Sequence, residues 1–297
     1  MTEKVVVAVD GSPGSEAALD WAIARARTTP VEFELTTVID LGFSPTKAAE
    51  TSVRPTYERV LADAATRIGE ALPGTSVLST LRRGAPRREL IFASATADLL
   101  VIGTHEPTGV FHGILPLQLA AASTSPVVVV PAGWAPRNGA VVIGVDDDET
   151  SEVALAFAAA EAVRLRTSLK LVHTWSIPYP LMINPYGLSP DAVDISQDAH
   201  QLVLDRAVEF VGREYPNLVV HPILRQGSPA TELVDVASTA ELLVVGTHRR
   251  GVIPAMLLGS VSHNVLVNVP CPVVVAPHPE EKQEHRRERE PRREEVR

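Results

Sequence analysis

Short runs of apolar, mostly β-branched residues recur along the chain. They alternate with longer segments whose apolar residues return every three or four positions. The first run, Val5–Val9, contains no polar residue, which is typical of a strand buried on both faces of a parallel sheet. Helical spacing follows over Ser15–Thr28. Because strands that alternate with helices form parallel sheets with right-handed crossovers, the pattern predicts an α/β fold.

The first part of the chain contains enough such segments for one complete five-stranded unit. We predict strands at Val5–Val9, Phe33–Ile39, Val77–Leu81, Leu99–Gly103 and Val127–Val130. We predict helices at Ser15–Thr28, Tyr57–Leu72, Pro86–Thr96 and Leu115–Ala122. The segment Leu41–Thr56 is poorly patterned, so we predict a loop there.

The second part of the chain repeats the first in the same order. VVVAVDGSPGSEAALDWA at Val5–Ala22 returns as VVIGVDDDETSEVALAFA at Val141–Ala158, and ADLLVIGTH returns as AELLVVGTH. LRRGAPRREL is matched by LRQGSPATEL, and SPVVVV by CPVVVA. The period far exceeds the roughly 20–50 residues of stacking repeats, so the chain is a duplicated domain.

The second copy is predicted to contain the same elements. Its strands are expected at Val141–Val145, Leu169–Thr174, Val219–Leu224, Leu242–Gly246 and Val273–Ala276. Its helices are expected at Ser151–Leu165, around Val203–Val211 on a long second helix, at Ala230–Ser238 and at Met256–Asn268. The segment Ser176–Leu188 holds three prolines and is predicted to be a loop.

Two tandem doubly wound domains, each a five-stranded parallel sheet flanked by helices, therefore account for most of the chain. We place them at residues 1–133 and 139–279, with a Pro- and Gly-rich linker between them. The fifth strands leave apolar sheet edges, so we expect the two copies to pair with each other through these strands. Residues 280–297 mix acidic and basic side chains without an apolar stripe, and we predict a disordered tail.

The composition argues against several classes of function. A net charge of −9 disfavours nucleic acid as a partner, because non-specific DNA binding needs a basic face. The apolar runs are far shorter than the roughly 20 residues that cross a bilayer, and MTEKVVVAVD shows no signal-sequence pattern. We therefore expect a cytoplasmic protein without a membrane partner. The single cysteine, Cys271, cannot form an internal disulfide and is expected to be buried and inert.

Candidate chemistry gathers where the strands end. In an open parallel sheet, ligands bind beyond the carboxyl ends of the strands, where the strand order reverses. The first strand of each copy ends in an acidic residue, Asp10 or Asp146, and the fourth strand ends in a glycine, Gly103 or Gly246. Glycines at this edge let backbone N–H groups approach a phosphate, and a helix N-terminus adds partial positive charge.

This combination resembles the universal stress protein superfamily in a tandem two-domain form, over nearly all of both copies. Nucleotide-binding members carry a Gly, two residues, Gly, nine residues, Gly, and then Ser or Thr. The resemblance implies that these glycines and the hydroxyl hold the phosphates and ribose, and that the Asp ending strand one contacts adenine. It also implies that the ligand is ATP or AMP, and it leaves open whether Mg²⁺ accompanies the nucleotide. Family members commonly dimerise through strand five. A homodimer of whole chains stays an alternative.

The second copy keeps much of this motif. Gly246 and Gly259-Ser260 stand at the family spacing, and Ser262 follows as a second hydroxyl. Arg249 replaces the middle glycine and is followed by Arg250. A non-glycine residue costs roughly 1–2 kcal/mol if that position needs a positive φ. An arginine there could also clamp phosphate with its planar guanidinium.

The first copy departs further. Gly103 is retained, but Glu106 takes the place of the middle glycine, and Gly113-Ile114 replaces Gly259-Ser260, so the hydroxyl is lost. We expect weak nucleotide binding or none in this copy. Its first turn, Asp10-Gly11-Ser12, is nevertheless more typical than the acidic run Asp146–Asp148, which could favour a divalent cation or repel phosphate.

Each residue also has a plain structural interpretation. Asp10 and Asp146 could cap the next helix, Ser260 could be an ordinary N-cap, and the glycines could simply end strands. Arg249 and Arg250 could be solvated, and His105 and His248 lack metal-like spacing to other ligands.

The sequence thus predicts a stress-response protein that binds an adenine nucleotide, mainly in the second domain, and acts as a sensor or regulatory module. The alternative is a nucleotide-free scaffold that acts through protein–protein contacts. No GxxxxGK[ST], GxSxG or HExxH motif occurs, so we expect binding rather than catalysis, with slow ATP hydrolysis left open.

Overall fold

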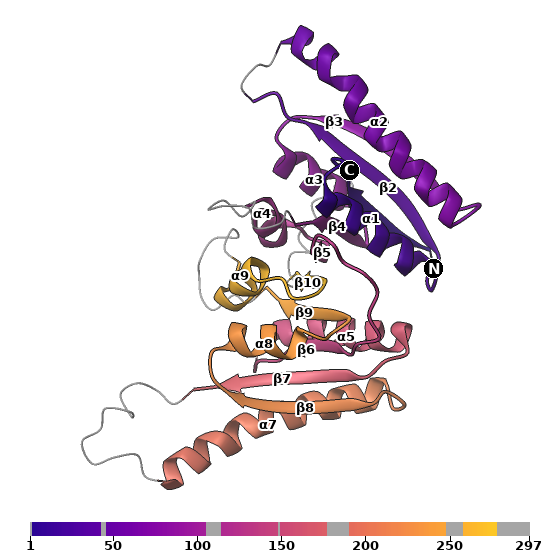
Figure 1. Ribbon diagram of the computed structural model, residues 1–297. Helices are drawn as coiled ribbons and strands as arrows, with labels where there is room; N and C mark the ends of the chain where they lie inside the picture. The colour runs from indigo at the N-terminus through magenta and orange to yellow at the C-terminus, as the bar shows by residue number, and fades with distance from the viewer. Residues whose placement is uncertain are drawn as a thin grey trace, which may run out of the picture.

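The computed structural model describes residues 2–42, 46–104, 114–147, 149–176, 190–247 and 258–277, and Figure 1 shows their arrangement. The predicted loop at 177–188 and the predicted tail at 280–297 lie outside these residues. Within them, none of the helices combines the length and apolar character that a membrane span requires.

All the described strands belong to one ten-stranded sheet in the order β3-β2-β1-β4-β5-β10-β9-β6-β7-β8. The strands of the first half are β1 Glu3–Ala8, β2 Val31–Ile39, β3 Val77–Arg83, β4 Leu99–Gly103 and β5 Val127–Val130. The strands of the second half are β6 Val141–Gly144, β7 Leu169–Trp175, β8 Val220–Gln226, β9 Leu242–Gly246 and β10 Val273–Ala276. Within each half every pair of neighbours is parallel, which confirms the predicted α/β class with two doubly wound units.

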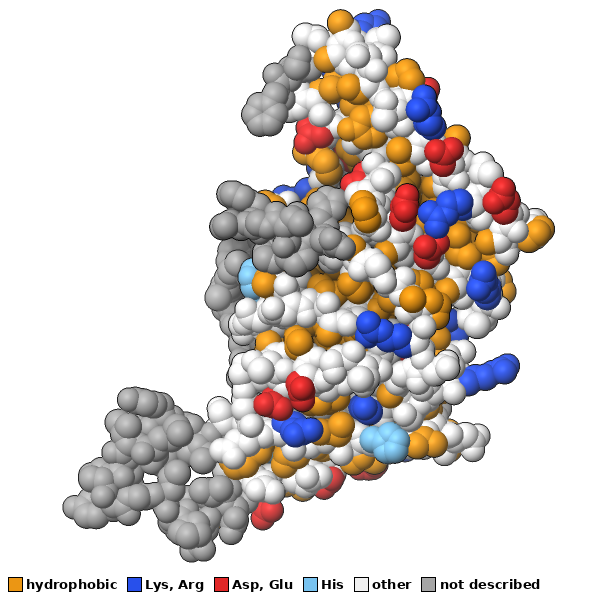
Figure 2. Space-filling model, in the orientation of Figure 1, with side chains coloured by type: hydrophobic (Ala, Val, Ile, Leu, Met, Phe, Trp, Pro, Cys, Tyr) orange, Lys and Arg blue, Asp and Glu red, His pale blue; other side chains and the backbone are white. Residues whose placement is uncertain are grey.

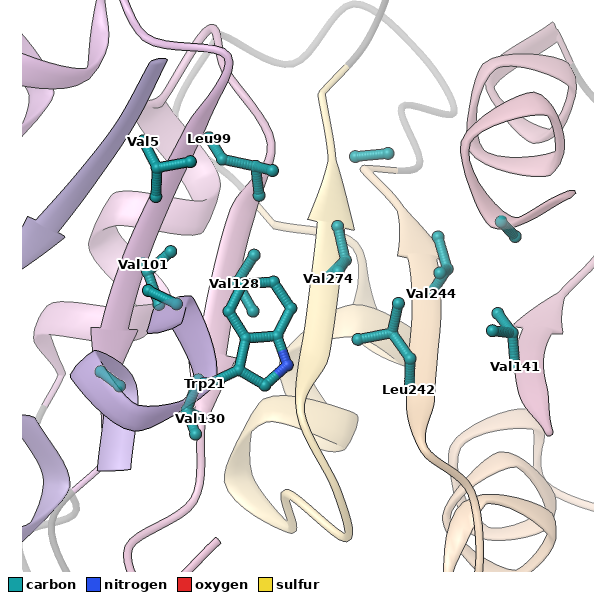
Figure 3. Packing of buried hydrophobic residues seen from close by; sticks show 14 of the residues in the cluster. Val5, Trp21, Leu99, Val101, Val128, Val130, Val141, Leu242, Val244 and Val274 are labelled. Carbon is teal, nitrogen blue, oxygen red and sulfur yellow. The ribbon is translucent and has the colours of Figure 1, made fainter. Parts of the chain in front are cut away.

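The two halves meet through their last strands. β5 and β10 run antiparallel, with Val274 opposite Val128 and Val273 opposite Val129. This pairing is self-complementary in the way of a two-fold interface, because corresponding residues of the two copies face each other. Figure 3 shows Val128 and Val274 on these neighbouring strands, with the Trp21 ring beside them.

Helices cover both faces of the sheet. The helices of the first half are α1 Pro13–Ala26, α2 Lys47–Ala71, α3 Pro86–Ser94 and α4 Leu115–Ala122. The helices of the second half are α5 Glu149–Leu165, α7 Pro190–Glu214, α8 Pro229–Ala237 and α9 Ser260–Val267. One apolar core lies under α1, α2, α5 and α7, and the other lies under α3, α4, α8 and α9. Both cores run through β5 and β10, so the halves share their interior.

One sequence prediction is wrong: most of the segment Leu41–Thr56 is not a loop. α2 begins at Lys47, where the Thr46 side chain accepts a hydrogen bond from the Ala49 N–H. The first turns of this helix face solvent and lack an apolar stripe, so periodicity cannot reveal them. Arg54 instead bridges two acids one turn away on either side, a pattern that stabilises exposed helices.

A buried ionic network also joins the halves. Arg25 of α1 contacts Glu3 of β1 at 2.7 Å and Glu161 of α5 at 2.8 Å, and Arg164 contacts Glu161 at 2.8 Å. Arg25 and Glu161 occupy corresponding positions in the two copies of the repeat. The duplication has therefore placed opposite charges face to face across the pseudo-two-fold axis.

The charged surface is mixed in sign. On the face seen in Figure 2, acidic and basic side chains are interspersed among hydrophobic ones. This face therefore lacks the continuous basic stripe that would favour a polyanionic partner.

Candidate functional site

A cavity of about 600 Å³ lies over the first half of the sheet. It opens at the carboxyl ends of β1, β2 and β4, next to the point between β1 and β4 where strand order reverses. Three of the site residues predicted for the first copy line it: Asp10, Ser12 and Gly103. The structure thus brings these three residues together around one space, while Gly11 is not part of the lining and Gly113 lies outside the described residues.

The turn after β1 gives the cavity its acidic wall. Gly11 adopts φ +79°, a left-handed conformation that favours glycine. Asp10 Oδ1 accepts a hydrogen bond from the Ser12 N–H at 2.9 Å, and Ser12 Oγ accepts one from the Ser15 N–H at 3.2 Å. The N-cap of α1 is therefore Ser12 and not Asp10, so the capping interpretation of Asp10 is wrong.

Gly103 does more than end its strand. A Cβ built on Gly103 would lie 1.9 Å from the Gly14 carbonyl oxygen, and one on Gly14 would lie 2.1 Å from the Thr104 oxygen. The first turn of α1 therefore packs backbone to backbone on the end of β4. This close approach fixes Ser12 and Ser15 at the mouth of the cavity.

Two threonines that line the cavity carry hydroxyl groups without a hydrogen-bond partner among the described residues. Thr36 and Thr37 of β2 are 0% and 2% exposed, both line the cavity, and neither Oγ1 atom is paired. A buried, unpaired polar group costs roughly 1–3 kcal/mol. Such groups are expected where a ligand or ordered water satisfies them.

The second half completes the cavity of the first. Leu266, Val267, Asn268 and Val269, at the end of α9 and just beyond it, line the same space. The sequence analysis missed this contribution because no local pattern reveals it. The end of α9 reaches this cavity only because β5 pairs with β10, since that pairing brings α9 beside α4.

The corresponding place in the second half is occupied by histidines. His173 takes the position of Thr37 in the strand register, and His200 takes that of Tyr57, the eleventh residue of each long helix. His173 Nε2 lies 2.8 Å from His200 Nδ1, and His173 Nδ1 lies 2.7 Å from the Val145 oxygen. Trp175 stacks on His200 at 5.9 Å between ring centres. The two histidine rings therefore lie where Thr37 and Tyr57 border the cavity in the first half.

This histidine pair predicts a pH effect on the second half. Burial, and then the charge of His173, lowers the pKa of His200, and Asp146 opposes this only in part. A lowered histidine pKa favours the neutral ring in the folded state. Stability is therefore complete above the unfolded pKa of about 6.5 and falls as the pH drops further.

We expect the thermal midpoint to fall from pH 7.5 to pH 5.5, and less so in His200→Tyr, which restores the residue of the first half. His263→Tyr, at an exposed position of α9, is the matched control and should follow the wild-type profile. An identical pH profile for His200→Tyr and wild type would disprove this role.

Of the site residues predicted for the second copy, the structure describes Asp146, Gly246, Gly259, Ser260 and Ser262. Ser262 Oγ donates to the Gly246 oxygen at 2.7 Å, and Gly259, not Ser260, is the N-cap of α9. A 430 Å³ pocket includes Asp146, but it lies between α5 and α7 and is lined by none of these glycines and serines. Asp146 Oδ1 accepts from the Asp147 N–H at 2.9 Å.

Several predicted residues lie outside the described residues, so the structure says nothing of their geometry: Glu106, Gly113, Arg249, Arg250, His105 and His248. Among the residues that are described, no three His, Cys, Asp or Glu side chains are placed to bind a metal ion. Burial raises the pKa of the Cys271 thiol to about 12, which keeps it protonated and unreactive.

The fold and the cavity define a class: a tandem pair of doubly wound α/β domains with a ligand-sized space beyond the strand ends. The model of the universal stress protein family matches residues 1–131 and again residues 138–277. The chain belongs to the universal stress protein family, with two copies of its domain.

Relatives with the same two-domain length support this membership. A universal stress protein of Mycobacterium tuberculosis is 30% identical over 303 residues, which cover 93% of this chain and 96% of the relative. Another from Mycobacterium bovis is 32% identical over 288 residues, covering 92% and 96%. Among solved structures, a universal stress protein of Archaeoglobus fulgidus has a TM-score of 0.70 at 20% identity, covering 92% of this chain and 98% of its own. This last likeness concerns the fold alone.

Proposed function

We propose that this universal stress protein binds an adenine-containing ligand in the cavity of the first half and acts as a sensor or regulatory binding module. The main support is the pair of buried, unpaired hydroxyls of Thr36 and Thr37 on the wall of the 600 Å³ cavity. The two residues are consecutive on β2, so their side chains point to opposite faces of the sheet, and each hydroxyl can by itself donate to and accept from a polar group of a ligand.

The shape of the cavity fits this class of ligand. Small-molecule sites are typically concave spaces of about 300–1,000 Å³ with mostly apolar walls and a few polar groups. Here Leu90, Ile102 and Leu117 supply apolar surface for a flat ring, and Asp10 and the threonines supply the polar groups. The family resemblance implies that Asp10 contacts the adenine.

We place the proposed site in the first half, although the sequence analysis favoured the second. In the second half Val172 and His173 stand where the first half has Thr36 and Thr37, so the unpaired hydroxyls are lost. The His173–His200 contact occupies the matching space. ATP or AMP, with or without Mg²⁺, are the ligands that the resemblance implies for either half.

The proposal predicts a specific loss of binding in Thr37→His, which copies the second half. Titration of the full chain with adenosine, AMP and ATP should show saturable binding of at least one of them. The imidazole should fill the cavity and weaken that binding by at least about tenfold, since one lost buried contact of about 1.4 kcal/mol already corresponds to this factor.

Thr66→His is the matched control, because Thr66 lies on the exposed side of α2 and bonds only to its own helix at Ala62. It should bind like the wild type. No saturable binding of any of the three compounds at millimolar concentration would overturn the proposal.

A ligand-free scaffold is the second candidate. The contact between His173 and His200 favours it for the second half, which would then serve mainly to complete the fold and the wall of the first cavity. In such a scaffold, the first copy and the charged tail at residues 280–297 would bind another protein. Loss of a protein partner on deletion of residues 280–297, while ligand binding is retained, would support this scaffold role.

A further inference from the structure

The charged side chains in the described lining of the first-half cavity are all acidic. Two carboxylates, Asp10 and Asp40, belong to its lining, and among the described lining residues there is no lysine or arginine. The described surroundings of a bound ligand are therefore acidic.

The N-terminus of α4, where a phosphate would bind, differs from the corresponding helix of the second copy. Leu115, Pro116 and Leu117, from the first turn of α4, line the cavity with apolar side chains. Phosphates bind at helix N-termini through free backbone N–H groups, and proline has none. Ile114, the N-cap, makes no side-chain capping bond. The second copy has Ser262 at the position of Pro116, each of them ten residues before the proline ahead of its fifth strand.

The polar groups that remain suit an uncharged ligand. Thr36, Thr37 and Tyr57 contribute hydroxyls to the lining, and Asp40 Oδ1 accepts a hydrogen bond from the Gly42 N–H at 2.9 Å, which orients that carboxylate. Hydroxyls can pair with purine ring nitrogens, and carboxylate oxygens can accept from an exocyclic amine or from ribose hydroxyls. A phosphate in the same space would meet carboxylates and find no described cation.

We infer that the first-half cavity selects an uncharged purine nucleoside over its phosphorylated forms. This inference rests on the proposed function, since it specifies which adenine-containing ligand the cavity takes.

The test is calorimetric titration of the full chain with adenosine, AMP and ATP at equal ionic strength. We expect adenosine to bind about tenfold or more tightly than AMP, and ATP to bind more weakly still, because like charges oppose each other in a partly enclosed site. Added salt should narrow the difference by screening it. Each titration is repeated on Thr37→His, so that nucleotide binding that survives in this variant is assigned outside the cavity.

Asp40→Asn provides the second variant. The amide oxygen can still accept from the Gly42 N–H, while one negative charge is removed. We expect this variant to narrow the preference for adenosine over AMP several-fold and to keep the thermal midpoint of the wild type. An unchanged ratio would overturn the electrostatic selection.

The remaining outcomes separate this inference from the proposed function. If AMP or ATP binds at least as tightly as adenosine, and Thr37→His abolishes that binding, the cavity binds adenine ligands but the selection is wrong. If none of the three compounds binds, the proposed function itself fails.

Discussion

Replacing Arg25 with alanine is expected to lower the free energy of unfolding by about 3–5 kcal/mol, the usual cost of removing one partner from a buried ion pair. Arg25 and Glu161 side chains are each only 5% exposed, and Glu161 stays buried when its main partner is removed. Arg164 on the same helix, which contacts Glu161 at 2.8 Å and donates to Thr28 Oγ1 just beyond α1 at 2.6 Å, can compensate only in part. Urea unfolding of wild type and variant measures the difference.

Two comparisons isolate the cause. Arg54→Ala removes an arginine that also bridges two acids, but on an exposed helix surface, and should cost less than about 1 kcal/mol. Arg25→Met combined with Glu161→Leu removes both buried charges and should recover most of the stability. If the double variant were as unstable as Arg25→Ala, the loss would come from packing and not from the unpaired acid.

The same pair sets a pH dependence. Burial alone would raise the pKa of Glu161, but the hydrogen bonds and charge of Arg25, and then of Arg164, hold that pKa below its ordinary value of 4.5. A lowered acid pKa contributes stability that is present above the unfolded pKa and lost as the pH falls below it. The difference between wild type and Arg25→Ala should therefore shrink below about pH 4.5.

The second large effect is expected from Gly103→Ala. The new methyl group would meet the backbone of Gly14 at 1.9–2.8 Å, so α1 must move away from β4. We expect a loss of at least about 2 kcal/mol, at the upper end of overpacking effects, because backbone cannot rotate away as a side chain can. Urea unfolding measures the loss, and ligand titration should show weaker binding because Ser12 and Ser15 move with the helix.

Gly69→Ala is the control for this substitution. Gly69 lies inside α2, and nothing lies within 4 Å of a Cβ built on it. Alanine should there raise stability by about 0.5–1 kcal/mol, since it lowers the entropy of the unfolded chain and favours the helix. A Gly103→Ala variant as stable as wild type would show that the close approach of α1 to β4 is unnecessary.

The architecture was largely readable from the sequence because buried parallel strands leave a strong pattern. The predicted bounds of β4, β5, β9 and β10 agree with the structure, since each is a short apolar run between polar turns. The first turns of α2 were missed for the opposite reason. Their stability comes from Thr46 and from charge pairs at the surface, and they have no apolar periodicity.

The site was only partly predictable. Asp10, Ser12 and Gly103 were found because each follows directly on a recognisable strand. The replacement of Thr37 by His173 is visible in the sequence, but its meaning depends on His200, which lies on a different element. The contribution of Asn268 to the first cavity could not be inferred at all, because it depends on how the two copies pack.

The outer strands of the ten-stranded sheet have a further consequence. β8 is the edge strand on one side and contains Pro222, which has no N–H to donate to an added strand. β3 is the edge strand on the other side and ends in the charged residues Arg82 and Arg83. Neither edge strand is therefore suited to pair with a strand of another chain. The valine-rich strands β5 and β10, which would pair more readily, are already paired with each other in the middle of the sheet. Concentrated preparations should therefore resist fibril growth until heat or acid pulls the two copies apart.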